Sequence, residues 1–198
     1  MSIMLLNDSA SRVLSLYTRD YFGRLHGREI ARELEMNQKT VSNVLSGLEA
    51  EGVLRSMTEG RNRLYSLDFR NLAIRHVLSM VEAEKAVGFV GSSALGSGFV
   101  EKLLASGSPM VVIFGSYAAG TQRKDSDLDL LVLSPFKASL SEVERFYGVE
   151  ASVKEYSKGE FALALAEGDK FIKEVLRNHV ILVGAEFFVR SVLDAASE

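Results

Sequence analysis

One short segment, residues 111–132, constrains this chain more than any other. It starts with four apolar residues that predict a buried strand. Near its end a second, mostly apolar run follows, and Asp127 and Asp129 lie at the start of this run. Side chains two positions apart on a strand point to the same face, so both carboxylates should be directed at one point. Two like charges held that close repel each other unless a cation lies between them. The pattern therefore predicts two strands and a cation site.

The residues that follow the first apolar run predict a phosphate site. Gly115 ends this run, and Ser116 should open a helix. Backbone N–H groups at a helix start favour a phosphate, glycine allows close backbone approach, and the serine hydroxyl adds a donor. Mg²⁺ is usually held by one or two carboxylates together with substrate phosphates. This combination is suited to the transfer of a phosphoryl or nucleotidyl group.

Each part of the motif also has a simpler interpretation. Ser116 alone would be a helix N-cap, and Asp127 and Asp129 alone would be solvated acids at a turn. The leucines at positions 128, 130 and 131 favour a buried strand instead, and acids in a buried strand need partners. We therefore favour the metal and phosphate interpretation for the combined motif.

The segment resembles the signature of the DNA polymerase beta-type nucleotidyltransferase superfamily, above all its minimal and kanamycin nucleotidyltransferase groups. The matching residues are Gly115-Ser116, Gly120 and Asp127-Leu128-Asp129, and the resemblance spans about residues 110–184. It implies that Gly115 and Ser116 hold the triphosphate and that Asp127 and Asp129 bind Mg²⁺. Arg123 is a further candidate for a phosphate contact, with a solvated charge pair beside Lys124 as the favoured alternative.

The resemblance also implies a third carboxylate on a later strand, as a second metal ligand or a general base. The candidate strand covers residues 149–156, where alternation places Glu150 and Ser152 on one face. Glu150 is our choice for the third catalytic carboxylate, and Glu155 is the fallback. The family pattern places the acid nearer Ser152, which has no carboxylate, so the sequence departs from the pattern in the catalytic part of the motif and not in the nucleotide-binding part.

The N-terminal third of the chain predicts a different module. A short helix over residues 28–35, a turn at Met36-Asn37 and a second helix over about residues 38–51 precede two short strands. Asn37 is a suitable N-cap for the second helix. This order resembles the winged helix-turn-helix DNA-binding domains of bacterial and archaeal regulators, in which the second helix enters the major groove. The implied DNA-binding residues are Gln38, Lys39, Thr40, Ser42 and Asn43 on that helix, with Arg61 and Arg63 on the wing.

The net charge of this N-terminal module does not by itself indicate that it binds DNA. Residues 1–68 hold nine Lys and Arg and nine Asp and Glu, so their net charge is zero. DNA-binding modules are often more basic, because phosphate contacts supply much of the affinity. Protein interaction or dimerisation, which this fold also serves, therefore stays open as an alternative.

Taken together, these patterns predict an α+β protein of two domains. Residues 1–88 should form the winged helix-turn-helix with a connecting helix, and residues 89–198 a nucleotidyltransferase-like mixed sheet with flanking helices. The chain has no cysteine, which excludes disulfides and thiolate metal sites. No apolar run approaches the ~18–20 residues of a membrane span. We therefore expect a cytoplasmic protein without a membrane partner, and structural roles for the three histidines.

The predicted function is Mg²⁺-dependent transfer of a nucleotidyl group from a nucleoside triphosphate to an acceptor hydroxyl, in a protein that also binds DNA. A nucleotide-responsive transcriptional regulator with little or no catalysis is the main alternative. An antitoxin-like partner protein is a third hypothesis, which the winged helix disfavours. Apolar helices near residues 11–22 and 71–87 favour a homodimer. The sequence leaves the nucleotide, the acceptor and the DNA target open.

Overall fold

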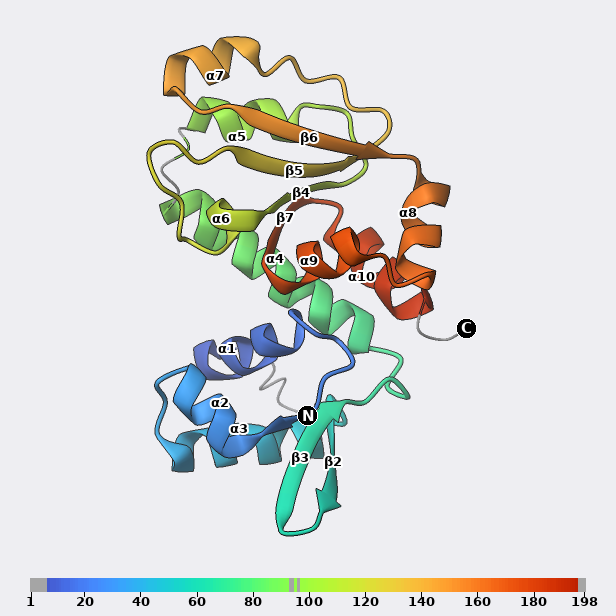
Figure 1. Ribbon diagram of the computed structural model, residues 1–198. Coiled ribbons are helices and arrows are strands. Elements are labelled where there is room, and N and C mark those ends of the chain that lie inside the picture. The colour runs from blue at the N-terminus through green and yellow to red at the C-terminus, as the bar shows by residue number, and fades with distance from the viewer. Residues whose placement is uncertain (1–6, 93–94, 96, 196–198) are drawn as a thin grey trace. The chain divides into compact units, whose positions relative to one another are not determined.

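The computed structural model describes residues 7–92, 95 and 97–195 (Figure 1). The chain divides into two compact units, Met1–Val81 and Glu82–Glu198. The division falls inside helix α4 (Ile74–Ser92), which also contains the boundary expected from the sequence, between residues 88 and 89. No helix within the described ranges is long and apolar enough to cross a membrane.

The N-terminal unit is a winged helix-turn-helix, as predicted. Its elements are α1 (Asp8–Tyr17), β1 (Leu25–His26), α2 (Gly27–Glu33), α3 (Gln38–Ala50), β2 (Leu54–Glu59) and β3 (Asn62–Leu67). The three strands form an antiparallel sheet in the order β1-β3-β2, in which β2 and β3 make the wing hairpin. Apolar side chains from the helices and the sheet are buried, among them Tyr17, Ile30, Leu45, Leu54 and Leu67.

Local signals fix the turn between the two helices of the motif. The Asn37 side chain accepts a hydrogen bond from the backbone N–H of Lys39 at 2.8 Å, which confirms the predicted N-cap of α3. His26 caps α2 in the same way, since its ring accepts from the backbone N–H of Arg28 at 3.0 Å. These caps set where α2 and α3 begin.

The C-terminal unit is built on a mixed four-stranded sheet, which confirms the predicted fold class. Its strands are β4 (Val111–Phe114), β5 (Leu128–Leu133), β6 (Ala151–Tyr156) and β7 (His179–Val183), in the order β6-β5-β4-β7. The β5–β6 pair is parallel, and the β4–β5 and β4–β7 pairs are antiparallel. The helices are α5 (Ser97–Leu104), α6 (Gly115–Ala118), α7 (Ser141–Tyr147), α8 (Lys158–Ala166), α9 (Lys170–Arg177) and α10 (Ala185–Ala195).

The two faces of this sheet have different partners. On one face, Leu128, Leu130 and Val132 of β5 pack in a buried cluster with Phe99 and Leu103 of α5. On the other face, strand register places Phe114, Asp129, Ser152 and His179 in one row across the sheet. Aromatic contacts from α9 and α10 reach this second face, through Phe171 against Phe114 and Phe188 against His179. The row containing Asp129 therefore lies beside α9.

Candidate functional site

A glycine turn joins β4 to the short helix α6. Gly115 has a φ of +67°, in the left-handed region that favours glycine. The N-cap of α6 is Phe114, without a side-chain hydrogen bond, so Ser116 lies inside the helix rather than capping it. The turn is closed by a hydrogen bond from the backbone N–H of Thr121 to the carbonyl oxygen of Ser116 at 2.9 Å.

Gly115 also leaves room for Asp129. A Cβ atom on Gly115 would lie 2.5 Å from Oδ2 of Asp129, closer than real Cβ contacts. Asp129 is half-buried in β5, directly opposite Phe114, whereas Asp127 is exposed in the residues that precede β5. The structure therefore brings the Gly115 turn and the Asp129 carboxylate into direct contact.

This contact predicts different costs for two glycine substitutions. Gly115→Ala and Gly120→Ala impose the same backbone strain, because both residues have a φ of +67°. Left-handed backbone costs a residue with a Cβ about 1–2 kcal/mol. Nothing lies within 4 Å of a Cβ on Gly120, so only Gly115→Ala should also displace Asp129. Chemical unfolding should show Gly115→Ala as the less stable variant, and equal losses would contradict the contact.

The two aspartates interact electrostatically. Burial raises the pKa of Asp129 above its usual value, and the negative charges of Asp127 and Glu174 raise it further. Burial also raises the pKa of Tyr117, with a second contribution from the charge of Asp127. A divalent cation would relieve the repulsion between the two carboxylates. The donor set therefore fits Mg²⁺, which prefers carboxylate oxygen.

In the part of the chain that the structure describes, no three His, Asp or Glu side chains form a group that could hold a metal. A cation at Asp127 and Asp129 would therefore need ligands from elsewhere. Substrate phosphates and water commonly complete a Mg²⁺ site that has only one or two protein carboxylates. The arrangement favours metal that arrives with a phosphate ligand over a preformed protein cage.

The strand next to Asp129 carries no carboxylate at the matching position. Register in the parallel β5–β6 pair places Ser152 beside Asp129. Glu150 lies just before β6, and its backbone carbonyl oxygen accepts a hydrogen bond from the N–H of Leu128 at 2.8 Å. Glu150 also lines an open groove together with Arg145. Glu155 accepts a hydrogen bond from Ser134 and, by alternation, lies on the opposite face from Ser152.

Arg123 lies in the turn that leads into Asp127. Its backbone N–H donates to Oγ of Ser126 at 2.8 Å, and its carbonyl oxygen accepts from the N–H of Ser126 at 3.1 Å. Arg123 and Lys124 are both exposed. The turn therefore sets the approach of the chain to Asp127 and leaves the Arg123 side chain at the surface.

A buried polar cluster supports the strand next to this turn. His179 lies opposite Phe114, and its Nε2 atom is 2.9 Å from Oε1 of Glu82 in α4. Lys85 Nζ is 2.7 Å from the second carboxylate oxygen of Glu82. Burial alone would raise the pKa of Glu82, but His179 and Lys85 outweigh burial and lower it to about 2. The cluster thus holds an ionised carboxylate in the interior.

The residues predicted to contact DNA occupy one region of the N-terminal unit. Gln38, Lys39, Thr40, Ser42 and Asn43 are exposed on α3, and Arg61 is exposed at the turn of the wing. An open pocket beside α3 is lined in addition by two residues that the sequence did not single out, His26 and Arg28.

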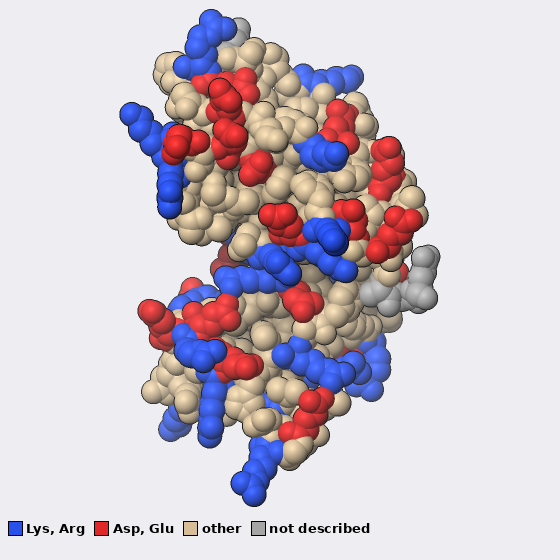
Figure 2. Space-filling view, in the orientation of Figure 1, with Lys and Arg blue, Asp and Glu red and all other residues tan. Residues whose placement is uncertain are grey.

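Arg63 differs from the other predicted DNA contacts because it is already paired. Its Nη2 atom is 2.6 Å from Oε2 of Glu49, and its Nε donates to Ser56 at 3.0 Å. Acidic and basic side chains are interspersed over the visible face of both units (Figure 2). The basic groups therefore have acidic neighbours rather than a broad positive surface in this view.

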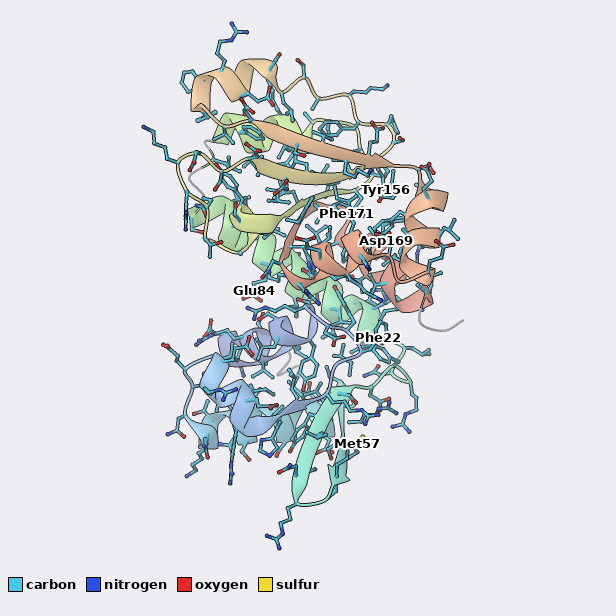
Figure 3. The ribbon with its side chains drawn as sticks, viewed as in Figure 1. Phe22, Met57, Glu84, Tyr156, Asp169 and Phe171 are labelled. Carbon is cyan, nitrogen blue, oxygen red and sulfur yellow. The ribbon has the colours of Figure 1, made fainter. Side chains whose placement is uncertain are left out.

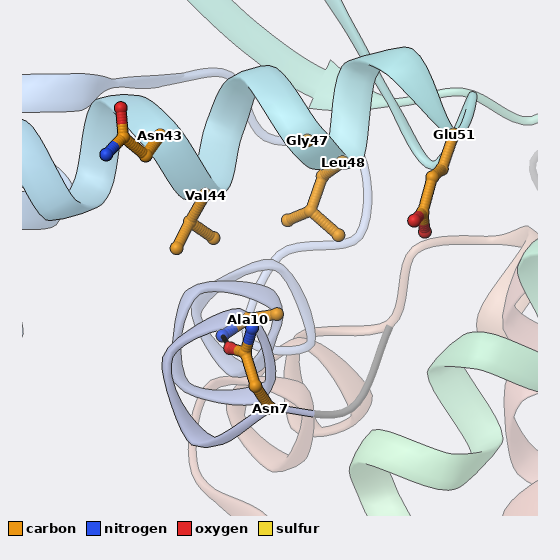
Figure 4. A pocket seen from close by; sticks show the side chains of 7 residues that line it. All are labelled: Asn7, Ala10, Asn43, Val44, Gly47, Leu48 and Glu51. Atoms are coloured by element: carbon orange, nitrogen blue, oxygen red, sulfur yellow. Dashed lines mark hydrogen bonds between the residues drawn. The ribbon is translucent and has the colours of Figure 1, made fainter. Parts of the chain in front are cut away.

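A small hollow lies between α1 and α3 (Figure 4). Val44 and Leu48 point from α3 toward α1, where Ala10 faces them. The hollow has a volume of about 20 Å³, which is room for about one water molecule. It is a packing gap and not a ligand site.

Comparison with known proteins gives the family of the C-terminal unit. The model of the nucleotidyltransferase domain family matches residues 97–197, half of the chain. No curated protein matches the chain. A solved structure with some similarity is that of TrmBL2, an archaeal chromatin protein described as showing a novel mode of DNA binding. It is 16% identical, with 86% of this chain and 72% of that chain covered, and its TM-score is 0.29.

Proposed function

The chain belongs to the nucleotidyltransferase domain family, and we propose that it transfers a nucleotidyl group from a Mg²⁺-bound nucleoside triphosphate to an acceptor hydroxyl. The observation that carries the proposal is the contact between the Gly115 turn and Asp129. It joins a left-handed glycine turn to a carboxylate that is already repelled by its neighbour Asp127. This neighbourhood of a glycine turn and two acids supports the proposal of a metal–triphosphate site.

The roles of the residues follow from their chemistry. The backbone at Gly115 and Ser116 would bind phosphate oxygens, and the exposed Arg123 guanidinium would add a charge-assisted contact. Asp127 and Asp129 would hold Mg²⁺, which neutralises phosphate charge when bound. The acceptor oxygen forms a bond to the α-phosphorus, the bond from that phosphorus to the bridging oxygen breaks, and pyrophosphate leaves. The acceptor proton must pass to a base.

Calorimetry tests the binding half of this proposal. ATP, GTP, CTP and UTP would each be titrated into the full chain, once with Mg²⁺ and once with a chelator. We expect binding of at least one nucleotide with Mg²⁺ and a large loss of affinity without it. The proposed site would be refuted if none of the four nucleotides binds, or if the affinity is the same with Mg²⁺ and with the chelator.

A nucleotide-responsive regulator without turnover is the second candidate. Ser152 favours it, because the strand position beside Asp129 lacks the carboxylate that the family pattern implies. Nucleotide bound in the C-terminal unit would then change the affinity of the N-terminal unit for DNA, a coupling between two sites. Pyrophosphate release separates the two candidates, because it occurs only with catalysis.

We propose that the winged helix-turn-helix binds DNA. The exposed polar side chains at the start of α3 support this role, since none of Gln38, Lys39 and Thr40 is acidic. Asn37 caps the start of α3 by accepting from the backbone N–H of Lys39, and the positive end of the helix dipole at this start favours a DNA phosphate. Lys39 and the wing residue Arg61 would supply positive charge.

The paired state of Arg63 gives this second proposal a sharp test. Arg61→Ala should reduce the slope of log affinity against log salt by about 0.9, the amount for one lost phosphate contact. Arg63→Ala should change the slope less, because Glu49 already neutralises that guanidinium. Fluorescence anisotropy with a duplex oligonucleotide at several salt concentrations measures both slopes. Equal slopes for Arg61→Ala and the unaltered chain would count against a DNA contact at the wing.

A further inference from the structure

The open pocket beside α3, called the α3 pocket from here on, has a volume of about 190 Å³. It is lined by the start of α2, one side of α3 and the strand β3 of the wing. Helix α2 contacts both α3 and β3, which brings the three elements together (Figure 1). Gln38 and Ser42, two of the proposed DNA contacts, are among the lining residues. The α3 pocket therefore adjoins the surface proposed to meet DNA.

The floor of the α3 pocket is apolar. Val41 and Leu45 of α3 and Tyr65 of β3 line it, with exposed fractions of 1%, 1% and 7%. Gln38 and Ser42 are spaced three or four positions from Val41 and Leu45, so all four lie along one side of α3. A phosphate contact needs hydrogen-bond donors or positive charge and has no use for an apolar floor. The floor therefore indicates a ligand that carries an apolar group.

One wall of the α3 pocket is held in place by the wing. Arg63 lines the pocket, and its guanidinium carbon lies 5.3 Å from the centre of the Tyr65 ring. The same guanidinium group contacts Glu49 and Ser56. Arg63 is therefore a fixed wall beside the apolar floor, and this accounts for a wing arginine whose charge is already neutralised.

The remaining polar side chains of the α3 pocket have hydrogen bonds to offer. They are the Gln38 amide, the Ser42 hydroxyl and the Arg28 guanidinium, and all three residues are exposed. Within the described part of the N-terminal unit, these three side chains have no hydrogen-bond or ion-pair partner. None of the described residues that line the pocket is Asp or Glu. The pocket thus sets free donors beside an apolar floor.

This combination matches one of the four bases as seen in the major groove. Thymine presents a hydrogen-bond acceptor, O4, next to an apolar group, the methyl at C5. Guanine presents two acceptors and adenine an acceptor and a donor, and neither base carries an apolar group there. Cytosine presents a donor, which favours an acidic partner. The apolar floor therefore favours thymine over the other three bases.

We propose that the α3 pocket reads a thymine in the major groove, a specificity that rests on the proposed binding of DNA by the winged helix-turn-helix. The thymine methyl group packs on the apolar floor, and O4 accepts a hydrogen bond from Gln38 or Ser42. Arg28, on the α2 side of the pocket, supplies positive charge to the DNA backbone beside this base.

Deoxyuridine in place of thymidine tests the pocket, because the exchange removes the methyl group and keeps O4. Selection from a random pool of duplexes with the full chain first gives a bound sequence. Fluorescence anisotropy then measures duplexes of that sequence in which each thymine in turn is replaced by uracil. We expect uracil at one position of the site to weaken binding about fourfold, the effect of one buried methyl group.

Gly27→Ala is a variant that fills part of the same pocket. Gly27 lines the pocket, and a Cβ atom there would lie 3.3 Å from Cδ1 of Leu45. Gly47→Ala on α3 is the matched control, because nothing lies within 4 Å of a Cβ at that position. Both glycines are helical, and neither has left-handed backbone. We expect Gly27→Ala to bind the thymine and uracil duplexes within about twofold of each other, and Gly47→Ala to keep the ratio of about four.

The other outcomes each decide against a stated part. If the unaltered chain binds no duplex, the proposed DNA binding itself is refuted. Equal affinity for thymine and uracil at every position overturns the thymine pocket, and a smaller salt slope for Arg28→Ala in that case would assign the pocket to a phosphate. A ratio of about four that persists in Gly27→Ala, with an unchanged melting temperature, also overturns the proposal, because the methyl group then lies elsewhere.

Discussion

Replacing Asp127 and Asp129 together with asparagine should abolish Mg²⁺-dependent nucleotide binding and leave the fold intact. Asparagine keeps nearly the same volume and removes both charges, so the cation loses the only protein carboxylates proposed for it. Asp129 is destabilised in its ionised form by burial and by Asp127. Removing that repulsion should leave the melting temperature unchanged or raised. Calorimetry and a thermal melt on the same protein would separate lost binding from lost folding.

Asp125→Asn is the matched control for this double variant. Asp125 is an exposed acid two positions before Asp127, and its replacement removes a charge from the same turn. General electrostatic attraction of Mg²⁺ to an acidic loop would weaken binding in this variant also. Specific binding by Asp127 and Asp129 predicts an affinity close to that of the unaltered chain. If the double variant still binds nucleotide in a Mg²⁺-dependent way, Asp127 and Asp129 do not hold the metal.

The raised pKa of Asp129 gives the same site a direction of pH dependence. A cation binds the ionised carboxylate, and burial together with Asp127 and Glu174 delays its ionisation to a higher pH. Mg²⁺-dependent affinity should therefore increase as pH rises through the pKa of Asp129. Well above that pH the Asp129 carboxylate is fully ionised, so the Mg²⁺-dependent affinity should no longer change with pH.

Local sequence signals predicted the parts of this site that are local in the chain. The mostly apolar residues 128–133 predicted strand β5, which carries Asp129 near its start and follows Asp127. The glycine at 115 is needed because the backbone there is left-handed and a Cβ would meet Asp129. These features depend on residues within about one strand and one turn of each other.

The remaining features depend on packing between distant segments, which periodicity cannot specify. Strand alternation made Glu150 a candidate, but the register of β6 against β5 places Ser152 beside Asp129. Helix α9 lies beside the row that contains Asp129 because Phe171 packs on Phe114. On the wing, the position of Arg63 was predicted, but its ion pair with Glu49 arises from the packing of α3 against the hairpin.

The largest stability effect should come from the polar cluster at Glu82, which no sequence pattern indicated. The Glu82 carboxylate is fully buried and contacts His179 and Lys85 at 2.9 and 2.7 Å. Its pKa in the folded chain is about 2, below the usual 4.5, so the ionised form is favoured by folding. This contribution is complete above pH 4.5 and is lost as pH falls from 4.5 toward 2. Acid should therefore weaken the C-terminal unit over this interval.

Glu82→Gln should destabilise the C-terminal unit at pH 7 by about 3 kcal/mol, because removing one partner of a buried pair leaves the others uncompensated. For a chain of this size, that loss corresponds to a melting temperature lower by roughly 6–12 °C. Calorimetric melts of the full chain would measure it, with Glu84→Gln as an exposed control on the same helix (Figure 3). The variant should also lose less stability than the unaltered chain between pH 4.5 and 2, because the contribution of Glu82 is absent. If the melting temperature of Glu82→Gln at pH 7 is within about 1 °C of that of the unaltered chain, the cluster adds no net stability. Neutral, well-packed replacements of buried ion pairs are often tolerated in this way.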